Sequence, residues 1–101
     1  MRTSSARRKV WDIQTRDLVA TLDTLLSPTG FLAHGLPTSA EVKGSLRIRS
    51  PELPVPVVIP VLVLAIESFN GEEVMILRAA DRRVVLSELM RAGQVQQRAA
   101  A

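Results

Sequence analysis

The side chains that most often carry out catalysis or hold metal ions are scarce in this chain. It contains no cysteine and one histidine, His34, among its 101 residues. Thiolate chemistry, zinc sites built on cysteine and metal sites that need two histidines are therefore excluded. Nothing near His34 in the sequence offers a suitably spaced carboxylate, and we interpret it as a solvated loop side chain. The sequence predicts no metal ion.

Three glutamates lie close together in the sequence, at Glu67, Glu72 and Glu73. Paired carboxylates can act as a general acid and base or bind a divalent cation. No third group completes either site, and charges at a strand end and turn also keep that end of a sheet solvated. The five glycines form no phosphate-binding loop, and no serine or threonine has a histidine and carboxylate pattern beside it. We predict that the protein is not an enzyme and uses no cofactor or small-molecule substrate.

The first nine residues form the one cluster with an obvious charged partner. They carry four cations, Arg2, Arg7, Arg8 and Lys9, and no acid, whereas the other 92 residues carry nine basic and ten acidic groups. Such an arm can bind a phosphate backbone by releasing counterions, without reading sequence. Nucleic-acid binding through these four residues is therefore the alternative function, and an ordinary solvated terminus is the competing interpretation.

Neither a secretory signal nor a membrane span is expected. The basic start is followed directly by charged residues within 10–17, where a signal peptide needs an apolar stretch. The longest apolar stretch, residues 53–66, contains three prolines and is too short to span a bilayer. We expect a cytoplasmic protein, or a virion component if the chain is phage-encoded.

The elements that position these residues begin with a predicted helix. Trp11, Leu18, Leu22 and Leu25 recur at the spacing of one helical face, which predicts a helix over residues 15–26, with an extension back to residue 10 as an open alternative. Thr15 is the expected N-cap, and Ser27-Pro28 ends the helix because a residue before proline avoids the α region.

The middle of the chain predicts a loop, a strand and an extended connection. Residues 27–41 show no sustained period and are expected to be a loop. From Val42 the pattern alternates, with Leu46 and Ile48 on one side and two arginines on the other, which indicates a half-buried edge strand. Residues 50–60 contain four prolines, so they are expected to form a polyproline-like connection without a regular ladder.

Residues 61–78 predict a β-hairpin at the centre of the domain. Asn70-Gly71 is a strong hairpin signal because a type I′ turn needs positive φ at both central residues. A two-residue loop fixes the register. On one side it pairs Phe69 with Glu72, Glu67 with Val74, Ala65 with Ile76, and Val63 with Arg78, and on the other it pairs Ile66 with Met75 and Leu64 with Leu77. Both faces are apolar, so both must be covered.

The last element follows Asp81, which can cap a helix over residues 82–92 ending at Gly93. An alternative continues residues 83–86 as another strand. Taken together, the sequence predicts a small α+β fold with an N-terminal helix, a three-stranded antiparallel meander that contains the Asn-Gly hairpin, and a C-terminal helix. The expected division is a flexible basic arm over 1–9, one domain over 10–93 and a disordered tail over 94–101.

The apolar hairpin predicts a function in association. A sheet that needs cover on two faces favours a non-enzymatic homo-oligomer, or a small subunit of a larger bacterial or phage assembly. One predicted contact set comprises Val61, Val63, Ala65, Val74 and Ile76. The opposite set comprises Leu62, Leu64, Ile66, Met75 and Leu77, and the sequence does not choose between them.

Overall fold

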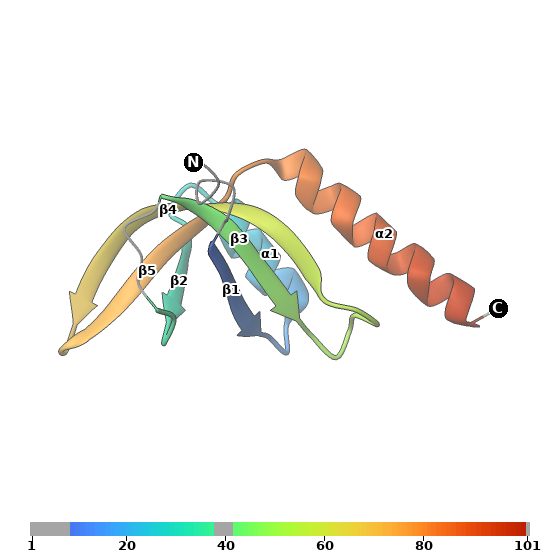
Figure 1. Ribbon diagram of the computed structural model, residues 1–101, viewed down its shortest axis with the longest axis horizontal. Helices are drawn as coiled ribbons and strands as arrows, with labels where there is room; N and C mark the ends of the chain where they lie inside the picture. The colour runs from blue at the N-terminus through green and yellow to red at the C-terminus, as the bar shows by residue number, and fades with distance from the viewer. Residues whose placement is uncertain (1–8, 38–41, 101) are drawn as a thin grey trace, which may run out of the picture.

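The computed structural model describes residues 9–37 and 42–100, with side chains as far as Gly93. Five strands form one sheet in the order β1-β3-β4-β5-β2, which curves into a half-barrel (Figure 1). Strands β1 and β3 run parallel, and every other neighbouring pair is antiparallel. In chain order the elements are β1 (Lys9–Gln14), α1 (Leu18–Leu26), β2 (Phe31–His34), β3 (Lys43–Arg49), β4 (Val57–Phe69), β5 (Glu72–Ala79) and α2 (Arg82–Ala100).

This five-stranded mixed sheet corrects the predicted three-stranded meander between two helices. The segment before the first helix is strand β1, in which Trp11 and Ile13 alternate with exposed neighbours. Strand β2 occupies part of the expected loop, and β3 is an interior strand rather than an edge strand. The first helix begins at Leu18 because the Asp17 carboxylate, rather than Thr15, accepts a hydrogen bond from the first turn at Ala20 N.

The predicted hairpin is confirmed. Asn70 and Gly71 adopt φ values of 52° and 83°, as a type I′ turn requires. The expected register also holds from Ala65 to Phe69, and the difference begins at Leu64. A bulge between Val63 and Ala65 adds one residue to β4, so Val63 pairs with Leu77 instead of Arg78. The bulge therefore changes which side chains share a face.

Strand β4 begins four residues earlier than predicted and accommodates Pro60. Residues 57–60 pair with β3 on one side, whereas β5 reaches only Val61, opposite Ala79. The Pro60 carbonyl accepts a hydrogen bond from the N–H of Ala80, the residue that follows the end of β5, so it points to the β5 side of β4. The missing N–H of proline lies on that same side, where no further strand needs a donor. The connection expected over residues 50–60 is thus shortened to 50–56.

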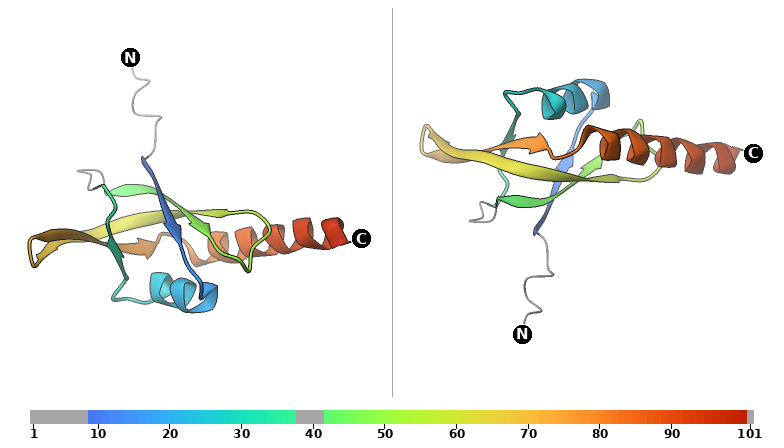
Figure 2. Two further views of the ribbon diagram at one scale, coloured as in Figure 1. Left: turned by 90° about the horizontal axis from the view of Figure 1, so that it is seen from below. Right: turned by 90° about the horizontal axis from the view of Figure 1, so that it is seen from above.

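The inner face of the half-barrel carries the core. Helix α1 connects the two edge strands β1 and β2, and it lies against this face (Figures 1 and 2). The buried side chains of α1 meet alternate residues of the strands, among them Leu46, Ile48, Ile59, Met75 and Leu77. Trp11 completes the core, and its Nε1 donates a hydrogen bond to Pro37 O at 3.0 Å.

Helix α2 packs beside strand β4. It begins at Arg82, which confirms the helix and excludes the alternative strand, and it continues to Ala100 past the glycine expected to end it. The helix lies beside the first residues of β4, where β5 has ended (Figures 1 and 2). Val85 and Ala92 join the core cluster from this position. Arg2, Arg7 and Arg8 of the predicted arm lie outside the described residues, and Lys9 opens β1.

Candidate interaction surface

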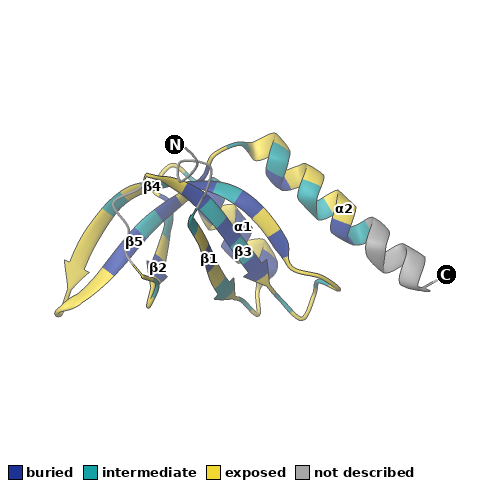
Figure 3. Ribbon diagram, viewed as in Figure 1, coloured by how far each residue is buried: buried dark blue, intermediate teal, exposed yellow. Residues whose placement is uncertain are grey.

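The outer face of the half-barrel carries the side chains that alternate with the core. Along β3, Gly44, Leu46 and Ile48 are buried on the inner face, so Lys43, Ser45, Arg47 and Arg49 lie on the outer one. The strand pairing extends this assignment across the sheet, because residues directly opposite each other share a face. Within the described residues, both helices contribute buried apolar side chains to the core cluster. Figure 3 shows how buried and exposed residues are distributed along the strands and helices.

An apolar band crosses the middle of the outer face. Leu32 and Leu64 are 49% and 44% exposed. Val74 lies on the outer face, opposite Glu67 and His34, and is completely buried although it does not belong to the core cluster. We use the name apolar band for the outer-face residues Leu32, Leu62, Leu64, Ala65, Val74 and Ile76.

Charges of opposite sign flank the apolar band. At one end, Lys43 and Arg78 both lie opposite Leu62, on either side of β4. At the other end, Glu67 lies opposite Val74 and Glu72 lies opposite Phe69, near the hairpin turn. We call these four residues the basic end and the acidic end. The surface is therefore polarised along the direction of β4 and β5.

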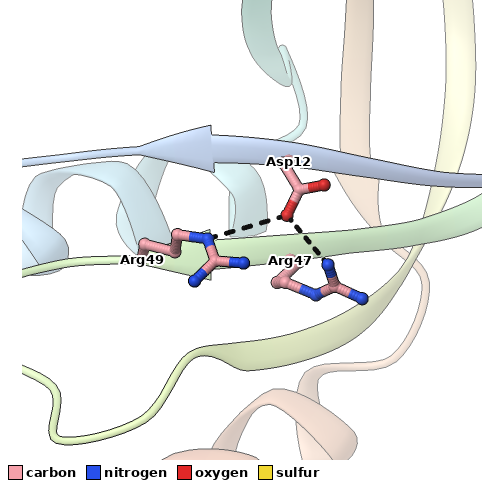
Figure 4. A network of polar contacts seen from close by, with 3 residues as sticks. All are labelled: Asp12, Arg47 and Arg49. Carbon is pink, nitrogen blue, oxygen red and sulfur yellow. Dashed lines mark hydrogen bonds and ion pairs between the residues drawn. The ribbon is translucent and has the colours of Figure 1, made fainter.

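Asp12 forms ion pairs with two arginines that lie beyond the basic end. Its Oδ1 lies 3.2 Å from Arg47 Nη1 and 3.9 Å from Arg49 Nε (Figure 4). These two ion pairs link β1 to β3 on the outer face. These side chains are partly exposed, so their attraction contributes little to stability. The network instead leaves Lys43 and Arg78 as the cations nearest the apolar band.

A polar cleft of about 460 Å³ lies where β1 and β3 end. It is lined by Gln14, Thr15, Arg16, Arg49, Ser50 and Pro51. The amides at the start of α1 would suit an anion, but Leu18 N already donates to Glu52 Oε2 and Ala20 N to Asp17 Oδ1. The carboxylates of the chain itself thus occupy the donors that an anion would use.

The bulge divides each of the two predicted contact sets between the faces. Val61, Val63, Met75 and Leu77 lie on the inner face. Leu62, Leu64, Ala65, Val74 and Ile76 lie on the outer face and all belong to the apolar band. Ile66 pairs with Met75 on the inner face but remains 42% exposed near the hairpin tip.

The residues considered for chemistry, His34 and the three glutamates, lie on and beside the hairpin. No group of three or more potential metal ligands occurs within the described part of the chain. His34 Nδ1 lies 3.9 Å from Glu72 Oε2, with both side chains more than half exposed. Glu67 and Glu72 share the outer face, whereas Glu73 pairs with Ser68 and faces the other way.

Sequence reasoning missed Leu32, Lys43 and Arg78 as surface residues of this site. Leu32 belongs to a strand of only four residues between turns, which resembles a loop in the sequence. The face of Lys43 was readable from its alternation with Leu46, but its position beside Leu62 depends on the pairing of β3 with β4. Arg78 was assigned opposite Val63, because no glycine or proline marks the bulge.

Among the described residues no helix has the length and apolar character needed to cross a membrane. No protein-family model matches the chain, and neither the curated proteins nor the solved structures contain a match.

Proposed function

We propose that the protein acts without catalysis, by association through the apolar band, as a homo-oligomer. The supporting observation is an apolar band, with Leu32 and Leu64 about half exposed, on the face opposite the core cluster to which both helices contribute within the described residues. Monomeric proteins rarely expose contiguous apolar patches, and patches rimmed by polar residues mark contact sites. A role as a small subunit of a larger assembly would use the same face and is the competing version of the proposal.

The energetics favour burial of the apolar band. Complete burial of a leucine side chain contributes about 2 kcal/mol, so covering the exposed half of Leu32 and of Leu64 contributes roughly 1 kcal/mol each. A symmetric contact counts every such side chain twice, once from each copy. This gain must exceed the entropy lost on association, and the flanking charges can add to it.

Size-exclusion chromatography with light scattering tests the proposal. The wild-type chain, of 11.0 kDa, is expected to elute as an oligomer at micromolar concentration. Leu32→Asp places a charge in the apolar band and is expected to give a monomer. Val19→Asp is the matched control, because Val19 is 63% exposed on α1 and lies away from the outer face.

Circular dichroism establishes that both variants retain the fold. The proposal fails if the wild-type chain is a monomer at tens of micromolar, or if Leu32→Asp leaves the oligomer intact. A wild-type monomer would leave the larger assembly as the version to pursue.

A further inference from the structure

We propose that the occupant of the outer face is a second copy of this chain, stacked across a twofold axis. The axis lies in the plane of contact, across the strands and at the level of the centre of the apolar band, so the basic end of each copy meets the acidic end of the other. The inference rests on the proposed function and adds to it the geometry of the contact and the residues that specify it.

The positions of the charges along the strands support a twofold arrangement. Ala65, Ile76 and Leu32 lie side by side on β4, β5 and β2 and mark the centre of the apolar band. Lys43 and Arg78 lie three residues from this centre, at the level of Leu62. In the opposite direction, Glu67 lies two residues away and Glu72 lies at the level of Phe69, four residues away. At roughly 3.3 Å per residue, the acidic pair is centred about 10 Å from Ala65. The basic pair lies about 7 to 10 Å away, because the three residues counted on β4 include the bulge and Arg78 is two residues from Ile76 on β5.

A twofold axis that lies between the two sheets, parallel to their planes and at right angles to the strands, turns the two outer faces toward each other and reverses the strand direction between the two copies. Because the charge pairs lie at similar distances on opposite sides of the axis, reversal brings each basic end over an acidic end. A parallel stack would place like charges together and would be unfavourable. Sheets that pack face to face also keep their strands within about 30° of each other, which preserves this correspondence along the strands. The twofold contact closes on itself and yields a dimer.

The charges concerned are available to a partner. Within the described residues Lys43, Arg78 and Glu67 make no ion pair, in contrast to Arg47 and Arg49, which share Asp12. Glu72 has one distant neighbour, His34 Nδ1 at 3.9 Å. Four charges that lack strong partners beside an apolar centre match the usual anatomy of an interface, in which a polar rim surrounds an apolar core.

The surface also has the extent that a dimer needs. Strand β4 is 13 residues long and lies between β3 and β5. Strands β2, β3, β4 and β5 have 4, 7, 13 and 8 residues, which at roughly 3.3 Å per residue and about 4.8 Å between strands present about 500 Å² in projection. A typical stable interface buries about 800 Å² of accessible surface on each partner. Side-chain relief makes accessible area larger than projected area, so the two values are comparable.

Other occupants fit the surface less well. A nucleic acid or an anionic membrane would be attracted to Lys43 and Arg78, but Glu67 and Glu72 would repel phosphates at the other end of the same surface. A matching partner needs acidic groups facing the basic end and basic groups facing the acidic end. A second copy of this chain in the reversed orientation has both.

Charge reversal at one end and then at the other tests the arrangement. The first variant, Lys43→Glu with Arg78→Glu, has two acidic ends. The second, Glu67→Lys with Glu72→Lys, has two basic ends. Each is expected to self-associate at least tenfold more weakly than wild type, because like charges then meet across the axis. An equimolar mixture is expected to recover a heterodimer with a Kd within about threefold of the wild-type Kd, since opposite charges meet again at both ends.

Sedimentation velocity measures these dissociation constants. Asp23→Lys with Glu88→Lys is the matched control, because it changes the net charge as much as the second variant does and leaves the outer face unaltered. This control is expected to dimerise like the wild type. Circular dichroism of each variant alone establishes that the fold is retained.

The outcomes separate this inference from the proposed function. If wild type dimerises, Leu32→Asp abolishes the dimer and both reversal variants still self-associate, the apolar band is the contact but the twofold charge pairing is wrong. If the mixture fails to recover a dimer, the pairing is likewise wrong. If the wild type is a monomer, both the inference and the homo-oligomer proposal fail.

Discussion

The close packing of the Trp11 ring on Gly44 makes a quantitative prediction. A Cβ atom added to Gly44 would overlap Trp11 Cζ3 and would lie 2.8 Å from Lys9 O and 2.9 Å from Trp11 Cη2. Trp11 cannot simply move aside, because it is 1% exposed and its Nε1 is bound to Pro37 O. Gly44→Ala must therefore displace the indole from its site.

The expected cost of Gly44→Ala is about 2 to 3 kcal/mol. Overpacking of a core typically costs about 1 to 3 kcal/mol. A lengthened hydrogen bond at Trp11 Nε1 adds up to about 1 kcal/mol. With a urea m value of roughly 1.5 kcal/mol per M, the midpoint should fall by about 1.5 to 2 M.

Urea denaturation followed by fluorescence measures this change, because Trp11 is the sole tryptophan and reports its own environment. Gly93→Ala is the matched control. Gly93 lies in α2 with no atom within 4 Å of an added Cβ, so the same substitution should raise stability by about 0.5 to 1 kcal/mol. All variants are compared at one protein concentration, since association adds to apparent stability.

A second comparison isolates the contact itself. Cζ3 and Cη2 belong to the six-membered ring of the indole, so Trp11→Phe removes the larger part of the overlap. Gly44→Ala should cost less in the Trp11→Phe background, as measured by circular dichroism. An equal cost in the two backgrounds, or a cost below about 0.5 kcal/mol in the wild-type background, would refute the reasoning.

Three further predictions concern the elements around the sheet, each measured by urea denaturation. Asp17→Ala removes the acceptor for Ala20 N and should cost about 1 kcal/mol, whereas Asp17→Asn should cost little; equal losses would contradict a capping role. Gly30→Ala should cost about 2 to 3 kcal/mol, because φ is 85° and the new Cβ would lie 2.8 Å from Ile76 Cγ2. Gly35→Ala has φ of 75° in open space and should cost about 1 kcal/mol, so a similar loss at both glycines would show that crowding at Gly30 is unimportant. Arg47→Ala should cost less than about 1 kcal/mol, and a larger loss would show that the Asp12 network is structural.

The hairpin was predictable because its signal is local. Asn70-Gly71 determines the turn, and the turn determines the register of the adjacent residues as far as Ala65. The predicted register fails at Leu64, because the bulge lies within a continuous apolar run and nothing in the sequence marks its position. Both predicted contact sets were therefore mixtures of inner-face and outer-face residues.

The two edge strands were not predictable because their partners are distant in sequence. Trp11 has the spacing of a helical face with Leu18 and Leu22, and the parallel partner that makes it a strand residue is Leu46. Strand β2 likewise depends on β5, across 46 residues from Phe31 to Leu77. The full apolar band was not predictable for the same reason, because Leu32 belongs to it only when β2 pairs with β5.

The connection of both edge strands through α1 constrains how the chain folds as it is synthesised. Residues 43–79 form a unit of consecutive antiparallel strands whose contacts are local. Strands β1 and β2, although made first, have partners that leave the ribosome 35 to 46 residues later. Closing such long loops is slow relative to hairpin formation. We expect the N-terminal third of the nascent chain to remain unpaired, with Trp11 and Leu25 exposed to solvent. Strands β1 and β2 then complete the half-barrel only after the hairpin has emerged from the ribosome.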